Sequence, residues 1–219
     1  MPDIKTVVKQ YARELGFDLV RITSAEEFAE DRAVALDRIK SGLMDGLPWY
    51  TENRVKRGTN PHELLPEARS IICVGLNYFQ EEGSETNSES DSNTPKGKVA
   101  RYARGRDYHK VIKQRMRQYV SGLSERLGSA VTARWYVDDG PMLDRAAAHR
   151  AGMGWFGKNT NILTSSHGSW VFLGILVTEL HIEPERLVYC DLKSRHGSLV
   201  SVDRPVGVPS VTIHPTIFI

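Results

Sequence analysis

Cysteine and long apolar runs are both scarce in this sequence. Its 219 residues include only two cysteines, Cys73 and Cys190, which cannot build a disulfide framework or a four-cysteine metal site. The longest apolar stretch, from Trp170 to Val177, is far shorter than the roughly 20 residues that cross a bilayer. The histidines show no metal-ligand spacing, and charges stand where a signal peptide would be apolar. We therefore expect a cytoplasmic protein with no membrane segment and no metal site of its own.

The net charge is also small, at +2, but charge is distributed unevenly along the chain. Residues 81–95 contain five acidic residues and no basic one, which predicts a solvated, mobile loop. Residues 96–117 contain nine basic residues and a single acid, Asp107. The charge run by itself favours a solvated helix face over a phosphate-binding surface. Net charge thus neither requires nor excludes a nucleic-acid partner.

Helical and strand-like segments alternate up to about residue 183. Apolar spacing predicts helices over residues 3–15, 24–42, 107–127 and 142–151, the second of them opened by a Ser24–Glu27 capping box. Runs of apolar and β-branched residues predict strands over residues 17–23, 68–78, 131–138 and 169–180. The pattern indicates an α/β domain with a central sheet flanked by helices. Residues 184–219 follow no helical period and form an atypical tail.

The strand predicted over residues 131–138 ends in two adjacent acids, Asp138 and Asp139, before a Gly-Pro turn. Ligands in α/β sheets bind beyond the carboxyl ends of strands, so an aspartate at this position could transfer protons. An aspartate before a Gly-Pro turn also commonly forms the turn or caps the next helix. The residues alone leave both explanations open.

A second candidate site is the glycine-rich stretch of residues 152–159, whose backbone amides could approach a phosphate or a flat cofactor. It is not a Walker loop, because Asn159 stands where Ser or Thr is required, and it follows a helix rather than the strand of a dinucleotide fingerprint. A plain connector explains the glycines equally well. Elsewhere, Asp107 is expected to cap its helix, His109 to lie at the surface, and Arg57 to lie in an exposed polar loop.

Four segments, taken in their order along the chain, carry a resemblance to a known family. They are VKRGTNPHELLPEARSIICVGLNY (55–78), ARYARGRDYHKVI (100–112), VDDGPMLDRAAAHRAGMGWFGKNTNIL (137–163) and GSWVFLGILVTEL (168–180). Over about residues 3–183 the chain resembles the N-terminal domain of epoxyqueuosine reductase. The resemblance implies a nitroreductase-like cobalamin-binding domain, related to reductive dehalogenases, that reduces the epoxide of epoxyqueuosine in the anticodon loop of tRNA during queuosine biosynthesis.

The resemblance also implies roles for individual residues. Asp138 matches the proton donor of the family and is expected to lie against the cofactor. The other expected cobalamin contacts are Arg57, Ala100, Lys158, Asn159 and Ile162. The expected substrate contacts are Asp107, His109 and Arg145. The resemblance therefore favours the interpretation of the basic residues 96–117 as a surface that binds the tRNA backbone.

One departure from the family concerns the electron path. The family continues with a ferredoxin-like module that holds two 4Fe-4S clusters, which need eight thiolates, whereas Cys190 is the only cysteine after Cys73. We expect a chain truncated, or shifted in reading frame, before that module, and dependent on an external electron donor or a cluster-bearing partner. The alternatives are a non-catalytic corrinoid-binding carrier and, on fold analogy alone, a relative of flavin nitroreductases.

Overall fold

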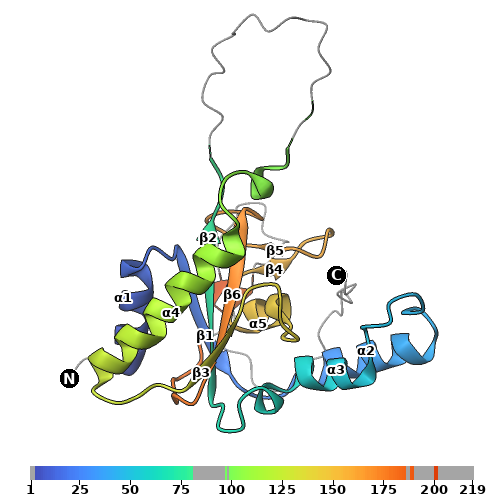
Figure 1. Ribbon diagram of the computed structural model, residues 1–219, viewed down its shortest axis with the longest axis horizontal. Coiled ribbons are helices and arrows are strands. Elements are labelled where there is room, and N and C mark those ends of the chain that lie inside the picture. The colour runs from blue at the N-terminus through green and yellow to red at the C-terminus, as the bar shows by residue number, and fades with distance from the viewer. Residues whose placement is uncertain (1–2, 81–96, 98, 186–187, 190–199, 202–219) are drawn as a thin grey trace, which may run out of the picture.

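The computed structural model describes residues 3–80, 97, 99–185, 188–189 and 200–201. A four-stranded sheet lies at its centre, with the strand order β1-β2-β6-β3 (Figure 1). These strands are β1 (Leu19–Ser24), β2 (Ser70–Asn77), β6 (Val171–Thr178) and β3 (Ala133–Tyr136). The predicted acidic loop at residues 81–95 and most of the tail at 184–219 lie outside the described residues.

All three pairings in this sheet are antiparallel, and β2 lies between β1 and β6. Ile72, for example, is opposite Ile22 on one side and Leu176 on the other. The predicted α/β fold with a central sheet is confirmed. Because neighbouring strands run in opposite directions, however, their carboxyl ends do not share one edge, and the general argument that drew attention to Asp138 does not apply to this sheet.

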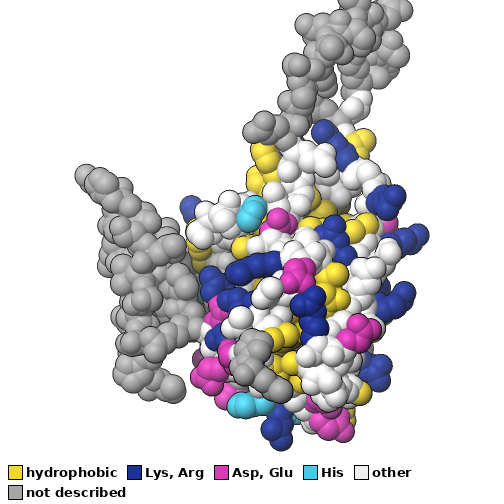
Figure 2. Space-filling model, turned by 90° about the vertical axis from the view of Figure 1, so that its left-hand side faces the viewer, with side chains coloured by type: hydrophobic (Ala, Val, Ile, Leu, Met, Phe, Trp, Pro, Cys, Tyr) yellow, Lys and Arg dark blue, Asp and Glu magenta, His cyan; other side chains and the backbone are white. Residues whose placement is uncertain are grey.

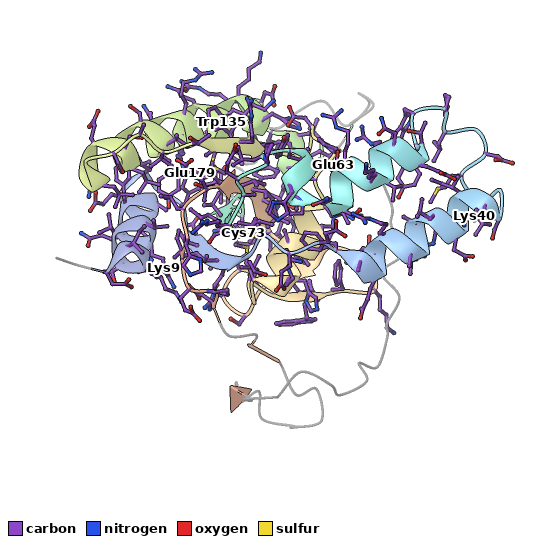
Figure 3. The ribbon with its side chains drawn as sticks, turned by 90° about the horizontal axis from the view of Figure 1, so that it is seen from below. Lys9, Lys40, Glu63, Cys73, Trp135 and Glu179 are labelled. Atoms are coloured by element: carbon purple, nitrogen blue, oxygen red, sulfur yellow. The ribbon has the colours of Figure 1, made fainter. Side chains whose placement is uncertain are left out.

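Helices cover both faces of the sheet (Figure 1). On one face, α1 (Ile4–Glu14) and α4 (Tyr108–Leu127) pack through Val8, Met116 and Leu123 against Ile72 and Val74. On the other face, α5 (Asp144–Arg150) packs through Ala147 against alternate residues of β2 and β6. Cys73 points to this second face, and Figure 3 shows it in the middle of the molecule. A strand buried on both faces is what its unbroken apolar run predicts.

The longest helix, α4, begins and ends where the sequence predicts. Asp107 is its N-cap, and the Asp107 side chain accepts a hydrogen bond from the backbone N–H of His109. At the other end, Gly128 adopts the left-handed conformation with φ +67°, which glycine reaches without a steric penalty. Capping thus determines where α4 begins and ends.

Two predictions about the segment between β1 and β2 are wrong. Ser24 is the last residue of β1 and does not cap a helix. Its hydroxyl donates to Glu26, and α2 (Ala29–Lys40) begins only after Phe28. Arg57 does not lie in a loop, because Thr51 caps a short helix, α3 (Glu52–Thr59), that contains it. A turn of 3-10 helix, Pro61–Glu63, then leads into β2.

Smaller elements complete the described part of the chain. A 3-10 turn, Arg101–Ala103, precedes α4, and the glycine-rich stretch contains a hairpin of β4 (Trp155–Phe156) and β5 (Ile162–Leu163). In the tail, β7 (Val188–Tyr189) pairs with β8 (Val200–Ser201).

Candidate functional site

The centre of the candidate site is Asp138, two residues beyond the end of β3. Its carboxyl oxygen Oδ2 accepts a hydrogen bond of 3.0 Å from the phenol of Tyr108 in the first turn of α4. Its backbone N–H donates a hydrogen bond of 3.0 Å to Oδ2 of Asp144, the first residue of α5. Asp138 has φ +55°, in the left-handed region that residues with a Cβ rarely adopt. An exposed carboxyl group is therefore held between two helices in an unusual backbone conformation.

The loop that carries Asp138 is tied down at neighbouring residues as well. Asp139 forms an ion pair with Lys113 of α4. Burial alone would raise the pKa of Asp139, but hydrogen bonds from Lys113 and from the N–H of Val137 outweigh it and lower that pKa. On the other side, Arg54 of α3 donates to the carbonyl of Gly140 over 3.2 Å.

Helix α3 approaches this loop so closely that only glycine fits at the contact. A Cβ atom placed on Gly58 would overlap the carbonyl oxygen of Pro141. The missed helix α3 is thus part of the support of the Asp138 loop. Arg57 is on the same helix, exposed, and its positive charge acts against the rise that burial causes in the pKa of Tyr136. The charge of Arg57 thus acts on Tyr136, the last residue of β3 before the Asp138 loop.

Asp144 is the residue of the site that the sequence analysis missed. Burial raises the pKa of its carboxyl to about 7, and the negative charges of Asp138 and Asp139 add to the rise, while the hydrogen bond from the Asp138 N–H and the charge of Arg145 oppose it. Its second oxygen, Oδ1, is buried and has no hydrogen-bond partner within the described part of the chain. The one signal in the sequence is an acid in the first turn of α5, six residues after Asp138.

The predicted substrate contacts Asp107 and His109 stand next to this centre. The His109 ring stacks on the Tyr108 ring at 3.9 Å, and its Nδ1 lies 2.8 Å from Oδ1 of Asp107. This side-chain hydrogen bond, followed by the one from the His109 N–H, lowers the pKa of Asp107. The structure therefore brings Asp107, His109 and Asp138 together through the side chain of Tyr108.

An array of aromatic rings continues from Tyr108 across the ends of the inner strands β2 and β6. Tyr108 stacks on Phe172 at 4.0 Å, Phe172 stacks on Tyr78 at 4.3 Å, and Tyr78 meets Trp170 edge to face. Beyond Trp170, the array borders a hollow of about 460 Å³ that contains Ala100. Its lining residues are Tyr78, Val99, Ala100, Arg101, Tyr102, Arg104 and Trp170. Exposed apolar side chains beside arginines could take a flat ligand with polar edges.

The glycine-rich stretch forms a separate part of the candidate site. Lys158 and Asn159 are exposed in the turn between β4 and β5, whereas the side chain of Ile162 is buried in the core. Arg145 donates to the hydroxyl of Thr160 in this turn over 3.2 Å. Since Asp144 and Arg145 are adjacent, α5 connects the hairpin turn to the Asp138 loop. A Cβ on Gly154 would overlap the backbone of Leu163, so this glycine serves close packing within the hairpin.

Basic side chains are spread over the face that carries α1 and α4. Figure 2 shows Lys and Arg there interspersed with acidic and apolar side chains, not gathered into one continuous basic surface. Among the described residues no cluster of three or more His, Cys, Asp or Glu could hold a metal ion. In the same part of the chain, no helix has the length and apolar character to span a membrane.

Comparisons with known proteins point to one family. Residues 59–139 match the family model described as epoxyqueuosine reductase QueG, DUF1730. The chain is 34% identical over 184 residues to an epoxyqueuosine reductase of Atelocyanobacterium thalassa, with 83% of this chain and 56% of that protein covered. It is 42% identical over 127 residues to one of Synechocystis sp., with 58% of this chain and 42% of that protein covered.

Solved structures agree with the sequence relatives. The epoxyqueuosine reductase of Streptococcus thermophilus superimposes with a TM-score of 0.74 at 26% identity, covering 85% of this chain and 48% of that one. Another match, at 26% identity and a TM-score of 0.68, covers 83% of this chain and 47% of an epoxyqueuosine reductase solved with an epoxyqueuosine-modified tRNA stem loop. The Bacillus subtilis enzyme, at 25% identity and a TM-score of 0.70, covering 87% and 49%, was captured with an aspartate-bearing catalytic loop swung out of the active site.

A more distant structure, a B12-dependent reductive dehalogenase, shares the fold at a TM-score of 0.52 and 16% identity, with 91% of this chain and 22% of that one covered. The chain spans about half the length of the curated relatives and solved enzymes that it matches. The chain is therefore related to the epoxyqueuosine reductases, and it corresponds to about half of such an enzyme.

Proposed function

We propose that this chain provides the cobalamin- and substrate-binding half of an oxidoreductase that converts epoxyqueuosine in tRNA to queuosine. The observation that carries the proposal is the hydrogen-bonded group of Tyr108, Asp138 and Asp144, which holds one exposed carboxyl group at the edge of the sheet. The proposed substrate is taken from a relative that was solved with an epoxyqueuosine-modified tRNA stem loop. The role of proton donor is assigned to Asp138 because the segment VDDGP resembles the family.

The proposed reaction removes the epoxide oxygen as water and leaves a double bond, so it consumes two electrons and two protons. Asp138 gives one proton to the oxygen while the C–O bond breaks, and solvent supplies the second proton that completes the water molecule. The phenol of Tyr108, 3.0 Å from Asp138 Oδ2, stabilises the carboxylate that this transfer produces. Burial, with the nearby charge of Asp138, raises the pKa of Tyr108, so the phenol keeps its proton and remains a donor at neutral pH.

The cofactor expected beside Asp138 is cobalamin. The hollow at Ala100 and the exposed rings of Trp170 and Tyr102 provide an apolar surface on which a large flat ring could pack. Arg57, Lys158, Asn159 and the backbone at Ile162 would hold the polar groups at its rim. Cobalamin, when bound, supplies the electrons that break the C–O bond. The distant B12-dependent dehalogenase has the same fold, which makes such a ligand compatible with it.

The chain has no residues that fit a 4Fe-4S cluster. A cluster needs about four thiolates, while the sequence has two cysteines, and Cys73 is buried in the sheet with its thiol pKa raised by burial. In the proposed function, electrons therefore reach this half from outside the chain, from a donor protein or a chemical reductant. Phosphate contacts to the tRNA backbone would come from the basic residues of the 3-10 turn and α4.

The proposal is tested with the purified chain, cob(II)alamin and a strong chemical reductant. A change in the absorption spectrum reports cofactor binding, and mass spectrometry of nucleosides from epoxyqueuosine-containing tRNA reports conversion. The proposal expects binding together with conversion to queuosine, and no conversion when cobalamin is omitted or replaced by a flavin. Binding without conversion would instead establish a corrinoid carrier, and binding of a flavin alone would establish a nitroreductase relative.

A further inference from the structure

We propose that Asp144 is a positioning residue for Asp138, an inference that rests on the proposed function for its catalytic meaning but not for its geometry. The carboxyl group of Asp144 accepts the backbone N–H of Asp138 and thereby holds that residue in the left-handed conformation in which its own carboxyl reaches Tyr108. Asp144 would thus select one of two positions of the Asp138 loop.

The backbone of Asp138 needs such support. A residue with a Cβ pays a steric penalty at φ +55°, and such conformations persist where surrounding contacts determine them. Tyr108 contacts only the side chain of Asp138, and the remaining contacts of the loop act on its neighbours: Lys113 pairs with Asp139, and Arg54 donates to the carbonyl of Gly140. Within the described residues, the amide of Asp138 itself donates only to Asp144.

The second carboxyl oxygen of Asp144 lies in an unfavourable environment. Oδ1 is buried and lacks a hydrogen-bond partner in the described part of the chain, although buried polar atoms are rarely left unpaired. A proton on Oδ1 would remove the unpaired charge, while Oδ2 would still accept the Asp138 N–H. Protonation therefore weakens the contact between Asp144 and Asp138 without abolishing it, since an ionised acceptor binds an N–H more strongly than a neutral one.

Charged and titratable groups on four sides determine when that proton is lost. The pKa of Asp144 is raised to about 7 by burial and by Asp138 and Asp139 on the loop, and is lowered by Arg145 on its own helix. Cys73 of β2 and Tyr108 of α4 face Asp144 as well, since the charge of Asp144 contributes to the raised pKa of each. The hold on Asp138 should accordingly tighten as pH rises through neutrality.

One relative shows that a catalytic loop with an aspartate can lie outside the active site. In the Bacillus subtilis enzyme, an aspartate-bearing catalytic loop is swung out of the active site. In the present structure the Asp138 loop is tied to α3, α4 and α5. If Asp144 biases the choice between such positions, its removal should shift the loop toward the released one.

The inference is tested by NMR on the full chain, labelled with 15N and free of cofactor, so that the result does not depend on activity. The proton shift of the Asp138 amide is followed from about pH 5.5 to 8.5, across the range in which Asp144 titrates. In the wild type the shift should move downfield with a midpoint near the pKa of Asp144, and the amide should be protected from exchange. In Asp144→Asn the amide should stay protected but lose this titration.

Asp144→Ala removes the acceptor, and the Asp138 amide should then lose at least about tenfold of its protection from exchange. If Asp144→Ala fails to fold, the lost titration in Asp144→Asn decides the matter alone. An Asp138 amide that is unprotected in the wild type, or that titrates identically in Asp144→Asn, would overturn the inference.

With tRNA and cobalamin, Asp144→Ala should lower kcat and leave KM unchanged, with Asp144→Asn close to the wild type. Absent conversion by the wild type would count against the proposed function and leave the NMR result standing.

Discussion

The phenol of Tyr108 donates a hydrogen bond of 3.0 Å to the carboxyl group of Asp138 and so joins the first turn of α4 to the loop after β3. The two residues are 30 positions apart in the sequence, and the sheet and the capped start of α4 bring them together. The same phenol ring stacks on Phe172 of β6, which fixes its direction. The position of the proposed proton donor thus follows from the packing of α4 on the sheet.

Replacing Tyr108 by phenylalanine keeps the stack on Phe172 and removes only the hydroxyl donor. Because a hydrogen bond to a charged group is worth about 1.5 to 3 kcal/mol, Tyr108→Phe should slow single-turnover epoxide reduction roughly 10- to 100-fold. Cobalamin affinity should change little. Tyr50→Phe, in the loop before α3, is the matched control and should react at the wild-type rate. An unchanged rate in Tyr108→Phe would mean that the phenol does not assist Asp138.

Adding a methyl group at Gly58 should disturb the Asp138 loop from the side of α3. The new Cβ would overlap the carbonyl oxygen of Pro141, so either α3 or the loop has to move. We expect Gly58→Ala to lower the free energy of unfolding by about 1 to 3 kcal/mol in urea denaturation. The control is Gly97→Ala, whose Cβ would meet no atom of the described residues within 4 Å. Equal stability of the two variants would refute the close contact of α3 with the loop.

Asp144 should make stability depend on pH. Its pKa is raised from 3.8 to about 7 in the folded state, so between these values the folded protein binds more protons than the unfolded chain. The contribution of this group to the free energy of unfolding is therefore complete at low pH and falls as pH rises toward 7. Asp144→Asn does not titrate and should be more stable than the wild type by roughly 1 to 3 kcal/mol at pH 8.

The measurement for this prediction is urea unfolding of both proteins at several pH values. The difference between them should shrink steadily toward pH 4, with Asp37→Asn, an exposed position on α2, showing no such trend. A difference that stays constant over the whole range would show that the Asp144 carboxyl does not take up a proton on folding.

The elements that sequence analysis predicts well have strong local signals. Asp107 and Gly128 mark the ends of α4, and the β-branched run of β2 predicts a strand buried on both faces. Helix α3 has only eight residues and one buried large apolar side chain, Val55, so its periodicity is too short to detect. The start of α2 was misplaced because Ser24 is the end of a strand, where its capping-box spacing has no meaning.

The site divides in the same way. Asp138 is predicted from its motif, but its hydrogen-bond partners depend on tertiary contacts that leave no local signal in the sequence. Nothing in the sequence LDRAAA indicates that the carboxyl of Asp144 is buried beneath a loop six residues earlier, and the pKa of Asp144 depends on that burial. Tyr108 is likewise marked as a helix residue by its neighbours, whereas its contact with Asp138 requires the fold.

The most direct test of the account is the rate of epoxide loss in Asp138→Asn. The chain is loaded with cobalamin, reduced chemically and mixed with epoxyqueuosine-containing tRNA, and the affinity for cobalamin is measured in parallel. Because a general acid typically contributes about 100- to 10,000-fold, the rate should fall by a factor of this size while cobalamin affinity stays nearly unchanged. A variant that binds cobalamin and reduces the epoxide at the wild-type rate would contradict the assignment of Asp138 as proton donor.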